Sequence, residues 1–490
     1  MRAILRRVVL VLASVVMTLA VIVGGLNLAF HLNFHRAAPD ASYPTPTSPL
    51  EAQQQDVDYF AKVIARDRAF SPAAREMAEA RLAALRTRPN ALPSPTLHVA
   101  LMQVMALADN GHSRMDAMAE QGALIVPLRL TRFAEGFYVT RAATTYREML
   151  AGRVVSIDGH PIDQILLQLD TLRGGVEGFR RENDATYIIA QDLLYGLGIA
   201  TDSKASTWTV MLSDGRTVTR RLDAYSMHQG DGIPPSGRWL SPEPSKGVEQ
   251  DWGAYHPQSA ELPETWRDLD NPFRIFPAPG GCAQVVRLQS IGDVGSQTIA
   301  PFLAAAEATL RANPPCAVIL DLRGDGGGDY TNTWHFAHVL PDLLAPGGRI
   351  YVLTNSQTFS AAITTAAFVK DAGGDRVTII GEPVGDRLSF FSEGNKACLP
   401  NLKVCAYPQT AKHDYQHSCD NWRECFWLNW VYPVRVKSLQ PDIVVPLRFE
   451  DWNMGHDAAY ETARQLAMHP AHKMEVRGSN PRVVPLRPGD

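Results

Sequence analysis

One uncharged apolar run stands at the start of the chain, and shorter patterned segments follow it. Val8 to Phe30 contains no charged residue, and three arginines precede it. This length suits a helix that crosses a hydrocarbon core of about 30 Å. The cationic flank would stay in the cytoplasm, so the remaining chain would be exported. We expect residues 1–36 to be an uncleaved membrane anchor, with a cleaved signal peptide as the alternative.

Helical patterns follow a Pro-rich stalk, residues 37–49. Apolar residues recur at helical spacing in three segments between Val57 and Ala108, and strand-like runs follow at 124–133 and 137–142. We expect residues 50–144 to form a helical N-terminal domain that carries His112. Ser71-Pro72 and Ser94-Pro95 are typical helix starts, because serine caps the first turn and proline fits its first position. Asn110-Gly111 should end the third helix and leave His112 on a loop.

The pattern changes to short strands after the helical segment. Tight-turn pairs at Asp158-Gly159 and Asp214-Gly215 separate apolar runs with alternating positions, which predicts a small β-rich domain over residues 145–225. Residues 226–275 are rich in Pro, Gly, Ser and Trp. We expect a long loop or insertion there.

Strands then alternate with helices, which predicts an α/β core over residues 276–450. The strands are expected at 283–288, 317–322, 349–353 and 377–380, and the helices at 296–312, after 330 and from 360. Residues 451–490 would form a C-terminal tail.

Composition narrows the class of protein. Lys and Arg number 47 against 51 Asp and Glu, which gives a net charge of −4, and 45% of residues are hydrophobic. Such a chain can bury large cores. Without a basic run, nothing favours nucleic acid as a partner.

Six cysteines fit an exported chain. Two local pairs suggest disulfides in an oxidising compartment: Cys398 with Cys405, and Cys419 with Cys425. The alternative is a metal site that combines the second pair with His413 and His417, although no CxxC or HExxH spacing supports it. Cys282 and Cys316 open two apolar strands, and we expect them to be buried thiols.

Two loops after core strands could carry chemistry. The loop from Asp321 to Asp329 contains Gly326, Gly327 and Gly328, which could present backbone N–H groups to an oxyanion or form a flexible turn. The pattern of a phosphate-binding loop is absent. Ser360 should start a helix after a strand, where it could be a nucleophile or an ordinary N-cap.

In combination, these loops resemble the C-terminal processing (tail-specific) and tricorn-core serine peptidases. The likeness continues through Gly381-Glu382-Pro383 and Ser392-Glu393-Gly394, covers residues 280–450, and extends more weakly over 95–225. The resemblance implies a crotonase-like core with a PDZ-like domain over residues 145–225.

The resemblance also implies roles for particular residues. Ser360 would be the nucleophile, His112 the general base, Glu393 the acid that orients His112, and the N–H groups of Gly327 and Ala361 the oxyanion hole. Glu382 is the alternative acid. Three positions depart from the family pattern: Asp386-Arg387 replaces the lysine of one branch, Gly111 the serine before the histidine, and Arg435 a later glutamate.

We therefore expect a membrane-anchored, exported serine peptidase, on the periplasmic side of a bacterial inner membrane. Its partner would be a peptide or protein substrate, and its chemistry needs neither a cofactor nor a metal. A non-catalytic binding protein on the same scaffold is the alternative. The sequence leaves the substrate and the oligomeric state open.

Overall fold

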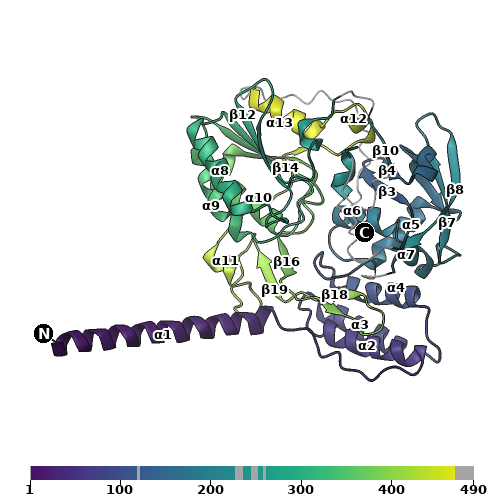
Figure 1. Cartoon of the computed structure of the whole chain (residues 1–490), viewed down its shortest axis with the longest axis horizontal. Helices are drawn as coiled ribbons and strands as arrows, with labels where there is room; N and C mark the ends of the chain where they lie inside the picture. The colour runs from purple at the N-terminus through teal and green to yellow at the C-terminus, as the bar shows by residue number, and fades with distance from the viewer. Residues whose placement is uncertain (1, 119–121, 227–235, 244–251, 258–260, 469–490) are drawn as a thin grey trace.

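A long N-terminal helix extends away from the folded body. The computed structural model describes residues 2–118, 122–226, 236–243, 252–257 and 261–468. Helix α1 (Arg2–Phe34) forms a separate rod that joins the body at its C-terminal end (Figure 1). Its segment Leu10–Phe34 has a mean hydropathy of 2.2 and is long enough to cross a membrane. Because the most apolar part is fully exposed, α1 is not a core helix, whereas an anchor and a signal sequence both fit.

Three helices form the N-terminal layer that holds His112: α2 (Pro49–Ile64), α3 (Pro72–Arg86) and α4 (Ser94–Met105). The Ser71 hydroxyl accepts a hydrogen bond from the N–H of Ala74, so the predicted serine cap of α3 is present. A short 3₁₀ turn (Ala106–Ala108) follows α4. Asp109, with φ of 44°, then takes the left-handed conformation that ends the helix and leads into the His112 loop.

A second layer is an antiparallel sheet with the strand order β10-β4-β5-β7-β8, in which β3 also pairs with β4. Its strands are β3 (Leu128–Phe133), β4 (Gly136–Ala142), β5 (Arg153–Ile157), β7 (Ala205–Met211), β8 (Thr217–Asp223) and β10 (Gly253–Ala254). Helices α5 (Ile162–Leu169), α6 (Glu177–Tyr187) and α7 (Gln191–Gly196) accompany it.

The start of this sheet corrects one predicted domain boundary. The sequence pattern placed residues up to 144 in the helical domain, but β3 and β4 belong to the sheet, since Tyr138 of β4 pairs with Arg153 of β5. The described part of the 226–275 segment also contributes, because β10 extends the edge at β4. Residues 227–235, 244–251 and 258–260 of that segment lie outside the described chain.

The core is a six-stranded sheet in the order β11-β12-β13-β14-β15-β20. The strands are β11 (Phe273–Pro277), β12 (Ala283–Leu288), β13 (Ala317–Asp321), β14 (Arg349–Thr354), β15 (Val377–Gly381) and β20 (Ile443–Val444). Strands β12 to β20 run parallel, and β11 is antiparallel to β12. The predicted alternation of strands and helices, and with it the α/β class, is confirmed.

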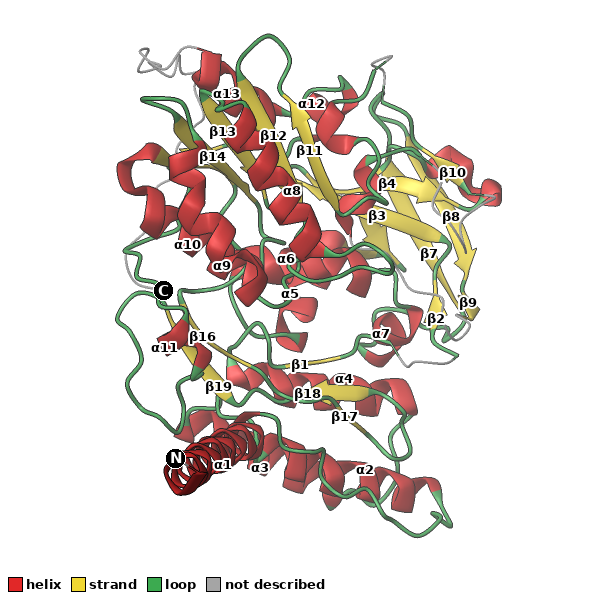
Figure 2. Cartoon of the chain, turned by 60° about the vertical axis from the view of Figure 1, so that its left-hand side comes forward, coloured by secondary structure: helices red, strands yellow, loops and turns green. Residues whose placement is uncertain are grey.

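Helices cover both faces of the core sheet. Figure 2 shows α8 (Ile299–Ala312), α9 (Thr331–Val339) and α10 (Ala361–Gly373) side by side over the strands. Helix α13 (Ala458–Met468) packs against the opposite face through a separate apolar cluster. Residues 458–468 are therefore part of the core rather than a tail, while residues 469–490 lie outside the described chain.

One segment after β15 connects the core to the N-terminal helices. Strand β16 (Ser389–Ser392) pairs with β19 (Ala411–Asp414), and β18 (Cys405–Tyr407) joins β17 (Ala397–Cys398) to β1 (Arg114–Met115). Since β1 directly follows the His112 loop, this segment holds that loop next to the core. Strand β6 (His160–Pro161) pairs with β5 in the antiparallel sheet. Other short elements include β2 (Leu124–Ile125), β9 (Tyr225–Ser226), α11 (Leu428–Val431) and α12 (Phe449–Asn453).

All six cysteines form disulfides. The two local pairs, Cys398–Cys405 and Cys419–Cys425, are joined as predicted, so neither sulfur of the second pair is available as a metal thiolate. Cys282 and Cys316 are also joined, with their Cα atoms 5.4 Å apart, and the prediction of buried thiols is wrong. The two residues immediately precede β12 and β13, whose parallel register sets them side by side.

Candidate active site

Ser360 lies where a core strand turns into a helix. It precedes α10 with φ of 55° and ψ of −124°, a backbone conformation that costs a non-glycine residue roughly 1–3 kcal/mol. Its hydroxyl makes no capping hydrogen bond. The turn is fixed by Thr358, whose hydroxyl donates to the Leu322 carbonyl. Ser360 therefore differs from an ordinary N-cap serine, whose hydroxyl would accept a hydrogen bond from the first turn of the helix.

The triple-glycine loop packs directly against this serine. A Cβ atom on Gly327 would lie 2.6 Å from the Cβ of Ser360 and 2.9 Å from the nitrogen of Ala361. Gly327 also has φ of 106°, which only glycine adopts readily. The loop therefore needs glycine here so that its backbone can approach Ser360 and Ala361.

The two N–H groups predicted to form the oxyanion hole, those of Gly327 and Ala361, differ in whether they are already hydrogen-bonded. The N–H of Gly327 donates to Oδ1 of Asp325 at 2.8 Å, so this N–H is already engaged. Burial raises the pKa of the Asp325 carboxyl well above its usual range. Ala361 is the first residue of α10, and its N–H lies at the positive end of the helix, where it can stabilise negative charge.

His112 is held in a column of stacked rings. The imidazole is 93% buried and lies between Phe359, at 4.2 Å, and Phe390, at 4.9 Å. Phe179 stacks on the far side of Phe359, and His413 on the far side of Phe390. Because Phe359 immediately precedes Ser360, the stacking places the histidine beside the turn that carries Ser360.

The carboxylate that faces His112 belongs to Asp386. Its Oδ2 is 3.4 Å from Nδ1 of His112, and the Asp386 side chain is almost completely buried. Among the residues that the structure describes, neither ring nitrogen of His112 has a partner in hydrogen-bond geometry, and the Ser360 hydroxyl is not bonded to the ring. Burial lowers the pKa of His112 below 6.5, and the Asp386 carboxylate opposes part of that shift.

The two glutamates predicted as the orienting acid lie elsewhere. Glu393 is next to a different histidine, with its carboxylate 3.6 Å from Nε2 of His413. Burial alone would raise the pKa of Glu393, but the contact with His413 lowers it. Glu382 accepts from the N–H of Leu447 and from Arg132. The structure therefore does not place Glu393 or Glu382 beside His112.

Asp386 was visible in the sequence only as a replacement for a lysine. A second departure from the family pattern is structurally linked to it, because a Cβ atom on Gly111 would lie 3.0 Å from Oδ2 of Asp386 and 3.0 Å from the Phe359 ring. A serine before His112 would therefore crowd the carboxylate. Glycine at position 111 therefore leaves the space that the Asp386 carboxylate occupies.

A separate cavity of about 370 Å³ lies between the antiparallel sheet and the core. Residues of both layers line it, including Arg132, Arg287, Arg323 and Glu382. Its wall also contains Gly324 and Gln357, which are three residues from Gly327 and from Ser360 along the chain. Neither Ser360 nor His112 lines this cavity, which thus adjoins the turn before Ser360 without including it.

Comparisons with known proteins give a structural match without a sequence match. No family model and no curated sequence matches the chain. The structure of mature CPAF complexed with lactacystin aligns with a TM-score of 0.56 and 14% identity, over 85% of this chain and 98% of that one. A serine-to-alanine mutant of CPAF aligns with a TM-score of 0.55 and 13% identity, over 86% and 98%.

The chain has the fold of mature CPAF. The alignment covers nearly all of CPAF, so the likeness includes the N-terminal helices, the antiparallel sheet and the core together. The expected relationship to C-terminal processing peptidases is confirmed at the level of the fold. At this identity the match to CPAF establishes the architecture alone, so the chemistry rests on the residues of this chain.

Proposed function

We propose that the chain is a serine peptidase in which Ser360, His112 and Asp386 form the catalytic triad. One observation carries the proposal. A strained serine at a helix start packs against a triple-glycine loop, and the residue before it stacks on a buried histidine that faces a carboxylate. This arrangement matches the nucleophile, base and orienting acid of acyl-transfer enzymes.

Each residue has a distinct role in the proposed reaction. The Ser360 hydroxyl attacks the scissile carbonyl carbon, and Nε2 of His112 takes its proton and passes it to the departing amine. Asp386 holds the proton on Nδ1 and stabilises the imidazolium that forms. A water molecule then attacks the acyl-enzyme. His112 takes a proton from this water and gives one to the Ser360 oxygen, which frees the acyl group as a carboxylic acid.

The oxyanion would be stabilised at the start of α10. The Ala361 N–H lies at the N-terminal end of α10, where the helix dipole favours negative charge. Gly327 contributes close approach rather than its N–H, which Asp325 already accepts. Catalysis requires the Ser360 hydroxyl to come within about 3 Å of the imidazole, a contact that tightens in many enzymes when substrate binds.

The surrounding layers would supply substrate binding. We assign the core as crotonase-like and the antiparallel sheet as PDZ-like, a domain type that takes an extended peptide as an added strand. The cavity between the two layers lies next to the nucleophile turn, which suits a peptide substrate that spans both. The substrates would be exported proteins or peptides.

We further propose that α1 anchors the enzyme in a membrane with its catalytic body on the exported side. The exposed apolar length of α1 supports this orientation together with the three basic residues before it. Three disulfides support an oxidising compartment such as the periplasm.

A non-catalytic binding protein remains the second candidate, because His112 and the Ser360 hydroxyl are not hydrogen-bonded. A fluorophosphonate probe separates the two candidates, since it reacts with an activated serine. We expect the wild-type protein to be labelled and Ser360→Ala to be unlabelled. A folded wild-type protein that neither reacts with the probe nor cleaves any member of a peptide library would refute the peptidase.

A further inference from the structure

Three of the nine tryptophans in the chain lie within residues 422–430. Trp422 lies inside the short loop that the Cys419–Cys425 disulfide closes, Trp427 follows that loop, and Trp430 is part of α11. Trp422 is 57% exposed, Trp430 50% and the neighbouring Val431 63%. Large apolar side chains gathered on one exposed segment of a soluble domain usually mark an interaction surface. We refer to residues 419–431 as the tryptophan loop.

The tryptophan loop packs against the end of the apolar helix α1. The Phe30 ring lies 5.4 Å from that of Phe426 and 5.8 Å from that of Trp427. Phe34, the last residue of α1, lies 5.5 Å from Trp427. The ring of Trp422 is a further 6.5 Å from that of Trp427. The exposed Trp422 is therefore connected through Trp427 to the last turns of the helix.

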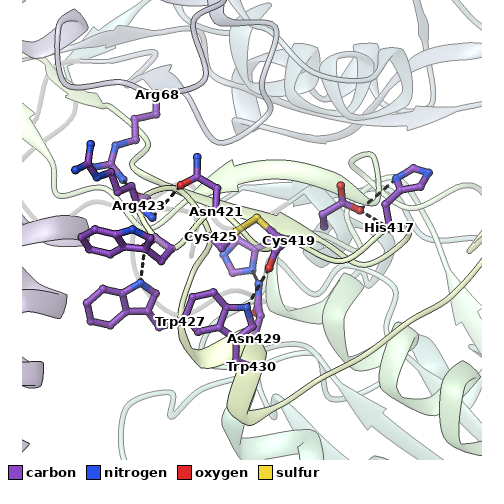
Figure 3. Close-up of a disulfide and its surroundings, with 12 residues drawn as sticks. Arg68, His417, Cys419, Asn421, Arg423, Cys425, Trp427, Asn429 and Trp430 are labelled. Carbon is purple, nitrogen blue, oxygen red and sulfur yellow. Dashed lines mark hydrogen bonds and ion pairs between the residues drawn. A yellow bond between two sulfur atoms is a disulfide. The ribbon is translucent and has the colours of Figure 1, made fainter.

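Polar contacts fix the tryptophan loop relative to α1. The Asn33 side chain donates to the carbonyl of Arg423 at 3.1 Å. The guanidinium of Arg68 donates to the same carbonyl and to Oδ1 of Asn33 at 2.9 Å. Figure 3 shows Arg68 and Arg423 side by side next to the disulfide. The disulfide and these bonds hold the loop in one position without burying its outer indoles.

Two of the three indole N–H groups are satisfied within the loop itself. Nε1 of Trp427 donates to the carbonyl of Trp422 at 2.6 Å, and Nε1 of Trp430 donates to the carbonyl of Cys419 at 3.0 Å. Both indoles lie on the same side of the disulfide in Figure 3. The exposed part of Trp430 can therefore enter the boundary of a lipid layer without leaving its N–H group unpaired, and at that boundary the N–H of Trp422 can bond to water or to a headgroup.

We propose that the tryptophan loop docks on the surface of the bilayer that α1 crosses, with Trp422 and Trp430 at the boundary between hydrocarbon and headgroups. Tryptophan is enriched at this depth in membrane proteins. The occupant is lipid rather than protein because the loop is tied to the very end of the apolar helix, where the hydrocarbon layer must also end. The inference rests on the proposed membrane anchor.

Arg423 supplies a complementary contact for lipid headgroups. Its guanidinium lies 5.4 Å from the centre of the Trp422 ring, and the side chain is exposed. An arginine stacked on an interfacial indole can reach a lipid phosphate while its stem stays against the ring. Docking at two points, α1 and the loop, would fix the orientation of the catalytic body on the membrane.

Tryptophan fluorescence in bromolipid vesicles tests the proposal on the full chain. Helix α1 contains no tryptophan, so all bromolipid quenching of the wild-type protein must come from the body. In phosphatidylcholine vesicles brominated near the headgroup end of the acyl chains, we expect clear quenching. The variant Trp422→Phe/Trp430→Phe should lose roughly half or more of it. The matched control Trp252→Phe, from the antiparallel layer, should keep it.

A second reporter separates this inference from the anchor on which it rests. Val16→Trp, placed in the double-variant background, reports whether α1 itself lies in lipid. If Val16→Trp is quenched but the double variant loses no quenching relative to wild type, the loop docks elsewhere and the inference is wrong. If Val16→Trp is not quenched, the anchor itself is contradicted. Unchanged near-ultraviolet circular dichroism shows that the double variant is folded.

Discussion

Oδ2 of Asp386 lies 3.4 Å from Nδ1 of His112, and both side chains are buried. The two residues come from distant parts of the chain, one from the loop after α4 and the other from the loop between β15 and β16. Their contact depends on the β16–β19 and β1–β18 pairings that join the core to the N-terminal helices. The proposed base and its orienting acid are thus assembled by the whole fold.

This contact predicts which carboxylate matters for catalysis. Asp386→Asn should lower kcat/KM by about 10²–10⁴-fold, because an amide cannot stabilise the imidazolium and can favour the wrong tautomer. Glu393→Gln, the matched control, should change kcat/KM much less, since Glu393 faces His413. Steady-state kinetics of both variants on one peptide substrate make the comparison. A larger loss in Glu393→Gln than in Asp386→Asn would restore Glu393 as the orienting acid.

The sequence predicted the core and missed contacts that depend on pairing between distant segments. The strands from Ala283 to Gly381 were predictable because each is a short apolar run bounded by helix starts or glycine turns. The Cys282–Cys316 disulfide was missed because it requires β12 and β13 to be parallel neighbours. β3 was assigned to the wrong layer for a similar reason, since its partner is found only in the folded sheet.

The residues of the candidate site also divide into those that the sequence predicts and those that only the fold brings together. Ser360 and His112 could be proposed because each stands at a local signal, a helix start and a helix end, in the order that the resembling family uses. Asp386 could not be assigned a role, because a carboxylate in a loop gives no local sign of which ring it faces. Glu393 was preferred on motif alone, and the fold turns it toward His413.

The glycine loop yields a prediction with a neighbouring control. Gly327→Ala would bring a Cβ atom within 2.6 Å of the Cβ of Ser360 and impose φ of 106° on alanine. It should reduce kcat strongly by displacing the nucleophile turn. Gly326→Ala adds a Cβ atom that meets nothing within 4 Å, so activity should stay close to wild type. Equal activities in these two folded variants would show that the loop does not position Ser360.

The pH dependence of kcat/KM should report His112. A general base acts when neutral, and burial lowers the pKa of His112 below 6.5, so activity should fall only as the pH drops below that value. Asp386 opposes the shift, so Asp386→Asn should move the acid limb to still lower pH in whatever activity remains. An acid limb above pH 6.5 in the wild-type protein would contradict the assignment of His112 as the base.

Buried histidines with a lowered pKa should also make the free energy of unfolding decrease as the pH falls. A histidine whose folded-state pKa is depressed contributes stability that is present above its unfolded pKa and is lost as the pH falls through the folded value. His98 is the clearer case, because burial lowers its pKa to about 4. The free energy of unfolding should therefore fall between pH 6.5 and about 4, and His98→Gln should reduce this dependence in chemical denaturation. An unchanged slope would show that His98 titrates normally.

Two of the three disulfides should differ clearly in their effect on the free energy of unfolding. In the chain-entropy description, closing the 34-residue separation between Cys282 and Cys316 contributes about 3.8 kcal/mol, and closing the 7-residue separation between Cys398 and Cys405 about 2.4 kcal/mol. The double serine variant of the first pair should therefore show the larger loss in the free energy of unfolding. Denaturant titration of both variants measures it, and a reversed order would contradict the entropic account.

The decisive prediction concerns the nucleophile and its base. Ser360→Ala should reduce peptide turnover by about 10³-fold or more, and His112→Ala should cost nearly as much, because members of a triad act as a unit and their losses do not add. Lys370, on the helix that Ser360 precedes, offers a control for a lysine-based mechanism. Its Nζ donates to the carbonyl of Val377 at 2.8 Å and lies 3.7 Å from Asp442, which ties it to β15 rather than to the serine. Lys370→Ala should therefore keep kcat close to wild type even if it lowers the melting temperature. Turnover that survives in purified Ser360→Ala protein, or a Lys370→Ala variant as inactive as His112→Ala while still folded, would show that the reaction does not proceed through Ser360 and His112.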